Sequence, residues 1–180
     1  MNNILYRVGD NLYINLTNRC PCACTFCLRQ STDTVGASDS LWLKEEPDFD
    51  TVKAEFSSKN LEEYGEVVFC GFGEPTERLA LLLEVADFVK AEYHKPVRLN
   101  TNGLGDLING RKIAPELQNR VDTVSITLNT PDRDDYLKLV GKTLQSEPWP
   151  RTGIRGFRRR YCGKALSGFP AAKRAVLRFS

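Results

Sequence analysis

The chain has 180 residues, of which 41% are hydrophobic and 27% are charged, and its formal net charge is +2. These values are typical of a globular domain and exclude disordered and fibrous proteins. The length suffices for one domain with a substantial core but is too short for a complete eight-unit βα barrel. No segment approaches the ~18 apolar residues of a membrane span, and the N-terminus lacks a secretion signal, so we expect a cytoplasmic protein.

Charge is unevenly distributed along the chain. Residues 148–180 contain nine Lys and Arg residues and no Asp or Glu, whereas the preceding residues are acidic overall. Such a segment could bind the phosphates of RNA or DNA, but a poorly structured extension is the simpler interpretation. Its one regular feature is a weak helical pattern near the end. We therefore divide the chain into a core at 1–147 and a basic tail at 148–180.

The predicted elements begin with a strand at 11–17, where leucine and isoleucine alternate with other residues. The cysteine-rich segment follows directly, and turn-forming residues extend this loop to about residue 40. A helix is then expected to run to about Tyr64, with Asp48 or Asp50 as its N-terminal cap.

The rest of the core alternates between strands and helices. Short runs rich in β-branched residues predict strands at 66–71, 96–100 and 121–129. Helical spacing predicts helices at 76–93 and 132–140, with broken helical turns at 106–118. Four strand–helix repeats indicate a parallel α/β sheet with right-handed crossovers. Ligands of such sheets bind at the C-terminal ends of the strands, where "GFGEPT", "NTNG", "LNTP" and the cysteines all lie.

Four of the six cysteines lie within eight positions of the first long loop. The spacing of Cys20, Cys24 and Cys27 places three thiolates on one loop, and thiolates are the usual ligands of iron–sulfur clusters. A disulfide is disfavoured in a reducing compartment, and a four-thiolate zinc site is the main alternative. The alternate positions of Cys20, Cys22 and Cys24 suit tetrahedral zinc poorly. We favour a cluster held by three cysteines, with Cys22 as a loop residue.

Two motifs carry a resemblance to a known family. The C-x3-C-x2-C pattern after a first strand, with Phe26 before its last cysteine, resembles the radical S-adenosylmethionine (SAM) enzymes. The segment "CGFGEPT" is similar to the glycine–glutamate motif of that superfamily. A narrower resemblance to the TatD-associated radical SAM proteins rests on "LTNRCPCACTFC", "LWLKEEP", "VVFCGFGEPTERL", "VRLNTNGL" and "VDTVSITLNTPD".

The resemblance implies a cofactor set and a reaction. Cys20, Cys24 and Cys27 would hold a 4Fe-4S cluster, and SAM would bind its fourth iron. Reductive cleavage of SAM would then give a 5′-deoxyadenosyl radical, which abstracts hydrogen from a substrate that the sequence does not identify. Phe26 would lie along the adenine. A flavodoxin or ferredoxin is the electron donor expected from similar enzymes.

Further residues are candidates for binding SAM. Gly71 and Gly73 would let the ligand approach the backbone, and Glu74 or neighbouring carbonyls could accept from the methionine ammonium. A helix N-terminal carboxylate is the alternative role of Glu74. Short polar side chains at the ends of the later strands would suit the ribose and the carboxylate of SAM. These are Asn100, Asn102, Ser125 and Asn129.

The remaining candidates are weaker. We expect Cys70 to be a small buried residue of its strand and His94, the one histidine, to be a surface residue. Cys162 has no partner that the sequence identifies.

One feature departs from the family pattern. The radical SAM core usually has about six βα units, whereas about four are predicted here, followed by the irregular tail. The expected fold is therefore a partial radical SAM barrel. Two alternatives stay open, namely a non-catalytic remnant that binds an iron–sulfur cluster or zinc, and a nucleic-acid-associated protein that uses the tail.

Overall fold

The fold is described from a computed structural model, in which residues 2–127, 130, 133–141 and 174–178 are placed. A six-stranded sheet has the order β1-β2-β3-β4-β5-β6. The strands are β1 (Leu5–Val8), β2 (Asn11–Ile14), β3 (Val67–Phe69), β4 (Val97–Thr101), β5 (Thr123–Thr127) and β6 (Arg174–Arg178). Strands β2 to β5 are parallel to one another, which confirms the four predicted βα strands.

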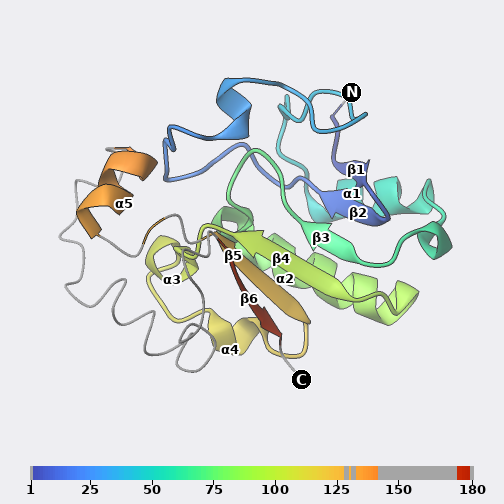
Figure 1. Cartoon of the computed structure of the whole chain (residues 1–180). Coiled ribbons are helices and arrows are strands. Elements are labelled where there is room, and N and C mark those ends of the chain that lie inside the picture. The colour runs from blue at the N-terminus through green and yellow to red at the C-terminus, as the bar shows by residue number, and fades with distance from the viewer. Residues whose placement is uncertain (1, 128–129, 131–132, 142–173, 179–180) are drawn as a thin grey trace.

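Both edge strands run antiparallel to their neighbours. Strand β1 forms a hairpin with β2, which the sequence did not predict, and β6 pairs with β5 over its full length. The end of the basic tail is therefore a strand, and the weak helical pattern there was misleading. Figure 1 shows β6 beside β5 at one end of the sheet. The rest of the tail, including Cys162, lies outside the described residues.

The helices follow the predicted order. They are α1 (Phe49–Ser57), α2 (Leu79–Phe88), α3 (Gly105–Ile108), α4 (Ala114–Leu117) and α5 (Arg133–Val140). Shorter helical turns are η1 (Leu28–Gln30), η2 (Leu61–Glu63), η3 (Pro75–Arg78) and the π-helical η4 (Val89–Tyr93). Within the described ranges, no helix is long and apolar enough to cross a membrane.

Helix α1 shows how local capping sets the boundaries. Asp48, rather than Asp50, is the N-cap, and its Oδ1 accepts from the Thr51 amide at 2.9 Å. The helix ends at Ser57, earlier than predicted, because Asn60 caps the separate turn η2. His94 follows η4 in the left-handed region, with φ of 53°. Its side chain is exposed, as predicted.

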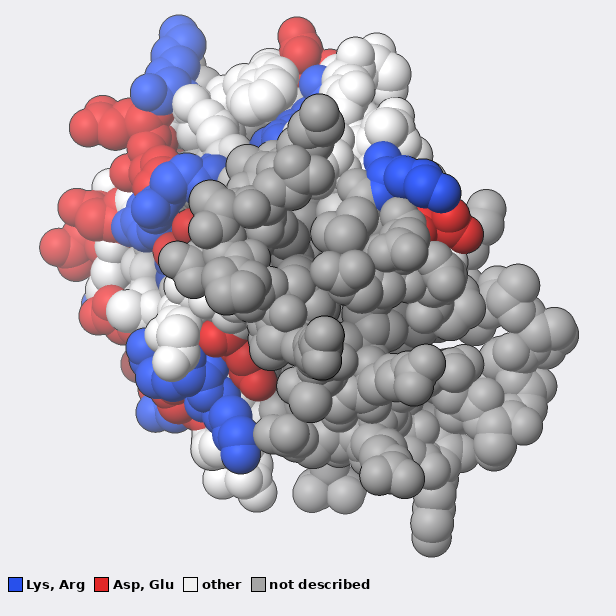
Figure 2. Space-filling view, turned by 90° about the vertical axis from the view of Figure 1, so that its left-hand side faces the viewer, with Lys and Arg blue, Asp and Glu red and all other residues white. Residues whose placement is uncertain are grey.

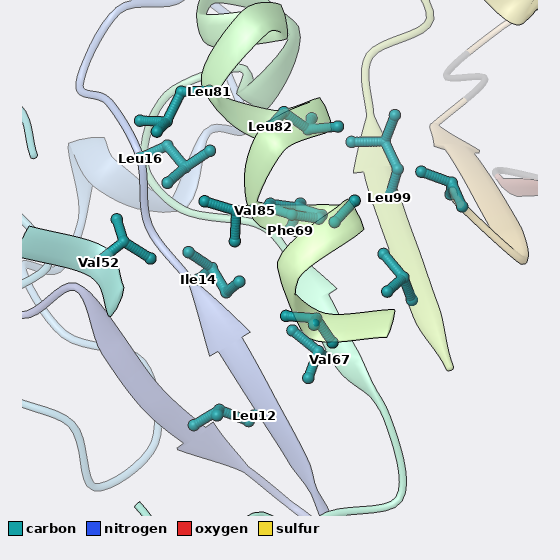
Figure 3. Close-up of a cluster of buried hydrophobic side chains, with 14 of the residues drawn as sticks. Leu12, Ile14, Leu16, Val52, Val67, Phe69, Leu81, Leu82, Val85 and Leu99 are labelled. Carbon is teal, nitrogen blue, oxygen red and sulfur yellow. The ribbon is translucent and has the colours of Figure 1, made fainter. Parts of the chain in front are cut away.

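The main core lies between the sheet and helices α1 and α2. Ile14, Phe69 and Leu99 are neighbours on adjacent strands and point toward Leu82 and Val85 of α2 (Figure 3). All five side chains are at most 1% exposed. Strand β3 is buried at every position and is apolar throughout, whereas buried and partly exposed residues alternate along β2 and β4, because only one face of those two strands packs into this core.

The opposite face of the sheet is covered differently. Tyr6, Leu41 and Phe72 form a second apolar cluster, in which Leu41 comes from the long loop after the cysteines. Asn100 of β4 and Ser125 of β5 are paired in register, one position away from the core residues Leu99 and Val124. They therefore lie on the same face as this second cluster.

Surface charges are mixed over the described part of the molecule. Figure 2 shows Lys and Arg side chains interspersed with Asp and Glu. Ion pairs join Arg120 to Asp87 and Arg111 to Glu116, each at 2.9 Å. The described part of this face therefore carries both positive and negative side chains. The role of the basic tail in nucleic-acid binding stays a prediction.

Candidate cofactor-binding site

The cysteine loop is held at the C-terminal end of β2 by contacts with three parts of the chain. Asn18 donates to the carbonyl of Leu43 at 2.7 Å and accepts from its amide at 3.1 Å, which fixes the start of the loop. Arg29, on η1, donates to the carbonyl of Cys22 at 3.0 Å and to that of Asn18 at 3.3 Å. A cationic guanidinium thus lies against the loop that carries the thiols.

Helix α5 provides the third contact. The amides of Ala23 and Thr25 donate to the carbonyls of Val140 and Leu139 at 2.8 and 2.9 Å. These carbonyls belong to the last turn of α5 and have no partner within the helix. The two loop amides therefore provide hydrogen-bond partners for the last carbonyls of α5. These hydrogen bonds also hold the cysteine loop against the end of the helix, beside which it lies in Figure 1.

Three of the four cysteines in the loop come together. Cys20 and Cys24 pack against the buried cluster that contains Cys22. The side-chain nitrogen of Asn102 is 4.0 Å from the sulfur of Cys20 and 3.9 Å from that of Cys22. Cys22 is buried, whereas Cys20, Cys24 and Cys27 are partly exposed.

Cys27 lies further along the loop. It precedes η1, and its amide donates to the carbonyl of Cys24 at 3.1 Å. Among the described residues, no set of three or more Cys, His, Asp or Glu side chains is arranged to hold a metal ion. The thiols of Cys20, Cys24 and Cys27 still have the chemistry that an iron–sulfur cluster requires, on one loop, so the donor set fits such a group. Their role as ligands stays a prediction.

The shared contacts perturb the acidity of the thiols. Hydrogen bonding to the Cys22 thiol lowers the pKa of Cys20 to about 7 and also lowers the pKa of Cys24. The same contacts, together with burial, raise the pKa of Cys22. Cys20 and Cys24 are thus the readier thiolates, which is the form that binds metals.

The glycines after β3 are used by the chain itself. A Cβ atom at Gly71 would lie 2.1 Å from Oδ1 of Asn15, and one at Gly73 would lie 2.3 Å from the carbonyl oxygen of Thr17. The Gly73 amide donates to that same carbonyl at 3.0 Å. The missing side chains therefore let the β3 loop pack against the segment that leads to the cysteines. Direct contact of these glycines with a ligand stays a prediction.

Glu74 connects the β3 and β4 loops. Its Oε1 accepts from the amide and hydroxyl of Thr76 at 3.2 and 2.8 Å and from the hydroxyl of Thr101 at 2.7 Å. Its Oε2 accepts from the Asn102 amide at 2.8 Å. The side chain is buried, and this burial raises the pKa of Glu74. Glu74 is also the N-cap of η3, as expected for a helix N-terminal carboxylate, and its predicted role in binding SAM stays a prediction.

The other residues predicted to bind SAM lie at different distances from the cysteine loop and Glu74. Asn102 reaches the cysteines, while Asn100 and Ser125 are register neighbours on the sheet face opposite the main core. Phe26 is 51% exposed beside Cys27. Asn129 lies outside the described residues. Cys70, expected to be buried, is partly exposed.

Some residues of the site were missed from the sequence. Asn15 is fully buried, and its side chain donates to the carbonyl of Leu41 at 2.6 Å. Thr17 hydrogen-bonds to Glu46, which also pairs with Arg78 at 3.0 Å. A run of Asn and Thr directly after a strand is the signal for such side-chain-to-backbone contacts.

One surface hollow lies beside this region. Its volume is about 600 Å³, and Arg19, Arg78, Glu77 and Arg111 are among its lining residues. The hollow includes none of the residues predicted to bind SAM. We therefore place the candidate site at the cysteine loop and the ends of β3 and β4, not in this hollow.

Comparison with protein families gives a match over most of the chain. The model described as the radical SAM superfamily matches residues 14–150, which is well over half of the chain. The match includes the cysteine loop, the Glu74 segment and Asn102. No curated protein matches the chain.

Proposed function

Because the chain belongs to the radical SAM superfamily, we propose that it binds a 4Fe-4S cluster and SAM and cleaves SAM reductively. The observation that carries the proposal is the meeting of the cysteine loop with Asn102 and the Glu74 loop at the C-terminal end of the parallel strands. Ligand sites of parallel α/β sheets lie at this end. The reaction class is hydrogen abstraction from a substrate that is not identified.

When bound, the cofactors would supply the radical chemistry, namely the reductive cleavage of a carbon–sulfur bond of SAM. The protein supplies ligands and orientation. Cys20, Cys24 and Cys27 would hold the cluster. Arg29 and the end of α5 would keep their loop in place, since both bond to its backbone.

The SAM-binding residues follow from the same arrangement. Glu74 already accepts four hydrogen bonds from the chain, so it acts by holding Asn102 in place. Backbone carbonyls near Gly71 and Gly73 are then the better acceptors for the methionine ammonium. Asn100 and Ser125 would bind polar groups of SAM on their sheet face, Asn129 would extend this set, and Phe26 would cover the adenine.

We also propose a subfamily, a cellular compartment and an electron donor for the chain. The motifs quoted above resemble the TatD-associated radical SAM proteins, and we propose this subfamily for the chain. The proposed setting is the cytoplasm, with a flavodoxin or ferredoxin as electron donor. The subfamily resemblance does not define a substrate.

The experiment is anaerobic reconstitution of the chain with iron and sulfide, followed by reduction and addition of SAM. We expect a brown protein that produces 5′-deoxyadenosine and methionine, measured by liquid chromatography with mass detection. Cys24→Ala should lose both cluster and product, whereas Cys70→Ala, which changes a cysteine outside the loop, should keep both. A colourless protein that retains one zinc would refute the proposal.

One observation favours a second candidate function. Strand β6 runs antiparallel along β5, the edge at which a further parallel βα unit would have to join. A chain closed in this way could bind the cluster without turnover. A brown protein that yields no 5′-deoxyadenosine under the same conditions would support this non-catalytic role.

A further inference from the structure

The segment that follows strand β2 is hydrogen-bonded to two other parts of the chain. The first is the loop after β3, which the proposed function assigns to SAM binding. The Thr17 carbonyl accepts from the Gly73 amide at 3.0 Å, and the Arg19 carbonyl accepts from the Glu74 amide at 2.8 Å. The position of the β3 loop therefore depends on how these two carbonyls are held.

The second part is the segment that carries Glu46. Oε1 of Glu46 accepts from the hydroxyl of Thr17 and from Nε of Arg19, the latter at 3.1 Å. The same hydroxyl accepts from the Arg19 amide at 2.9 Å, so one carboxylate orders both residues. Oε2 pairs with Arg78 at 3.0 Å, and Arg78 also donates to the Pro47 carbonyl at 3.0 Å.

The contacts of Glu46 differ from those of an exposed ion pair. Its side chain is 30% exposed, and Thr17, to which it is bonded, is 1% exposed. Exposed ion pairs contribute little to stability, whereas hydrogen bonds to a charged group are stronger and shorter than neutral ones. Loss of the carboxylate would also leave Arg19 and Arg78 near each other without their shared anion.

We propose that Glu46 is a positioning residue of the candidate SAM site and acts through Thr17 and Arg19. This inference rests on the proposed function. By fixing these two residues, the carboxylate holds their carbonyls in line with the amides of Gly73 and Glu74. The backbone carbonyls of the β3 loop then keep the position in which they would accept from the methionine ammonium.

The alternative is that Glu46 only stabilises the fold. In that case its loss would speed hydrogen exchange of backbone amides throughout the core, whereas loss of a positioning residue affects one loop. The test is amide hydrogen exchange of the cluster-free full chain, followed by nuclear magnetic resonance. In Glu46→Ala, the Gly73 and Glu74 amides should exchange at least about tenfold faster than in the wild type. The Cys70 amide, which donates to the Ile14 carbonyl at 3.0 Å just before this loop, should change much less.

Glu45→Ala is the matched control, because Glu45 is exposed and contacts Asn2 through its backbone carbonyl. It should leave the exchange of both loop amides unchanged. Thr17→Val should behave like Glu46→Ala, and Thr17→Ser, which keeps the hydroxyl, should behave like the wild type. The double variant Glu46→Ala/Thr17→Val should exchange no faster than Glu46→Ala, because the two residues act as one unit. The two Thr17 variants also provide the test if Glu46→Ala fails to fold.

A second measurement is the affinity of the reconstituted chain for SAM, determined by equilibrium dialysis at equal iron content. Glu46→Ala should bind SAM about tenfold more weakly than the wild type and Glu45→Ala. An equal increase in exchange at Gly73, Glu74 and Cys70, or an unchanged affinity for SAM, would overturn this inference alone. A wild-type chain that binds no SAM would overturn the proposed function together with it.

Discussion

Single residues at the ends of β3 and β4 connect the fold to the candidate site. Glu74 accepts four hydrogen bonds, two of them from backbone amides, and one of these amides belongs to Asn102. The side-chain nitrogen of Asn102 then reaches the sulfurs of Cys20 and Cys22. A buried carboxylate therefore fixes the residue that contacts the thiols.

The buried state of Glu74 predicts a pH dependence of stability. Because burial raises its pKa above 4.5, the folded chain holds the Glu74 proton more tightly than the unfolded chain does. The stabilisation is complete below pH ~4.5 and is lost as pH rises through the folded pKa, by at most about 1.4 kcal/mol per pH unit. We expect the unfolding free energy of the wild type minus that of Glu74→Gln to fall as pH rises from 4.5 to 7.

The measurement is chemical denaturation of the cluster-free proteins at each pH. Other titrating groups contribute equally to both proteins, so their contributions cancel in the difference. A difference that grows with pH would show that the four donors outweigh burial, and it would contradict the prediction.

The close packing of Gly73 predicts that its replacement by alanine lowers both stability and iron binding. An alanine Cβ would lie 2.3 Å from the Thr17 carbonyl oxygen and 2.5 Å from that of Arg19, so the β3 loop would have to move away from the cysteine loop. We expect Gly73→Ala to lower the unfolding free energy by about 3 kcal/mol and to reduce iron bound after reconstitution. Denaturation and iron analysis measure the two effects.

Gly65→Ala is the matched control for Gly73→Ala. Its Cβ would meet Asn11 at 3.4 Å, an ordinary contact, so its stability should change by less than about 1 kcal/mol and its iron content should stay the same. Equal behaviour of the two variants would contradict the close-packing role of Gly73.

At the scale of elements, the C-terminal end of α5 docks against the cysteine loop. Gly141 follows the last residue of α5 with φ of 73°, and a Cβ there would lie 3.0 Å from the Ala23 carbonyl oxygen. Gly110 has a similar φ of 63° but nothing within 4 Å of its Cβ position. Replacing either glycine by alanine would therefore strain the backbone. Only the alanine at position 141 would also collide with the cysteine loop.

Comparing Gly141→Ala with Gly110→Ala separates the effect of backbone strain from the effect of losing the contact between α5 and the cysteine loop. Both Gly141→Ala and Gly110→Ala should lose about 1 kcal/mol of stability, because alanine is disfavoured in the left-handed region. Only Gly141→Ala should also lose iron faster to a chelator, since it disturbs the loop backbone at Ala23. A Gly110→Ala variant that releases iron equally fast would show that general destabilisation is sufficient.

The elements also show what the sequence could predict. Alternation of apolar residues located β2, and helical spacing located α2, because burial on one face imposes these periods directly. Strand β1 was missed because it is only four residues long, and its pairing with the predicted β2 depends on the tight turn at Gly9 (φ 58°) rather than on a long alternating pattern. The contact of Cys22 with Cys20 and Cys24 was missed because it depends on α5, more than one hundred residues away, rather than on local spacing.

At the scale of the whole molecule, four parallel strands bring distant loops to one end of the sheet. The sequence predicted this convergence, because connections in a parallel sheet place every strand's C-terminal end on the same side. It did not predict the antiparallel β6, since strand pairing at an edge is set by tertiary contacts rather than by local pattern. Nor could it predict that Gly71 and Gly73 pack within the chain, because their contacts are with Asn15 and Thr17, which are more than fifty residues away.

The central claim is that this sheet end holds an iron–sulfur cluster on the cysteine loop. The most direct measurement is the iron and sulfide content of the anaerobically reconstituted chain, together with electron paramagnetic resonance after reduction. We predict about four irons and four sulfides per chain with a cubane signal, lost in a Cys20→Ala/Cys24→Ala/Cys27→Ala triple variant and kept in Cys70→Ala. A wild-type chain that binds no more iron than the triple variant would contradict the account.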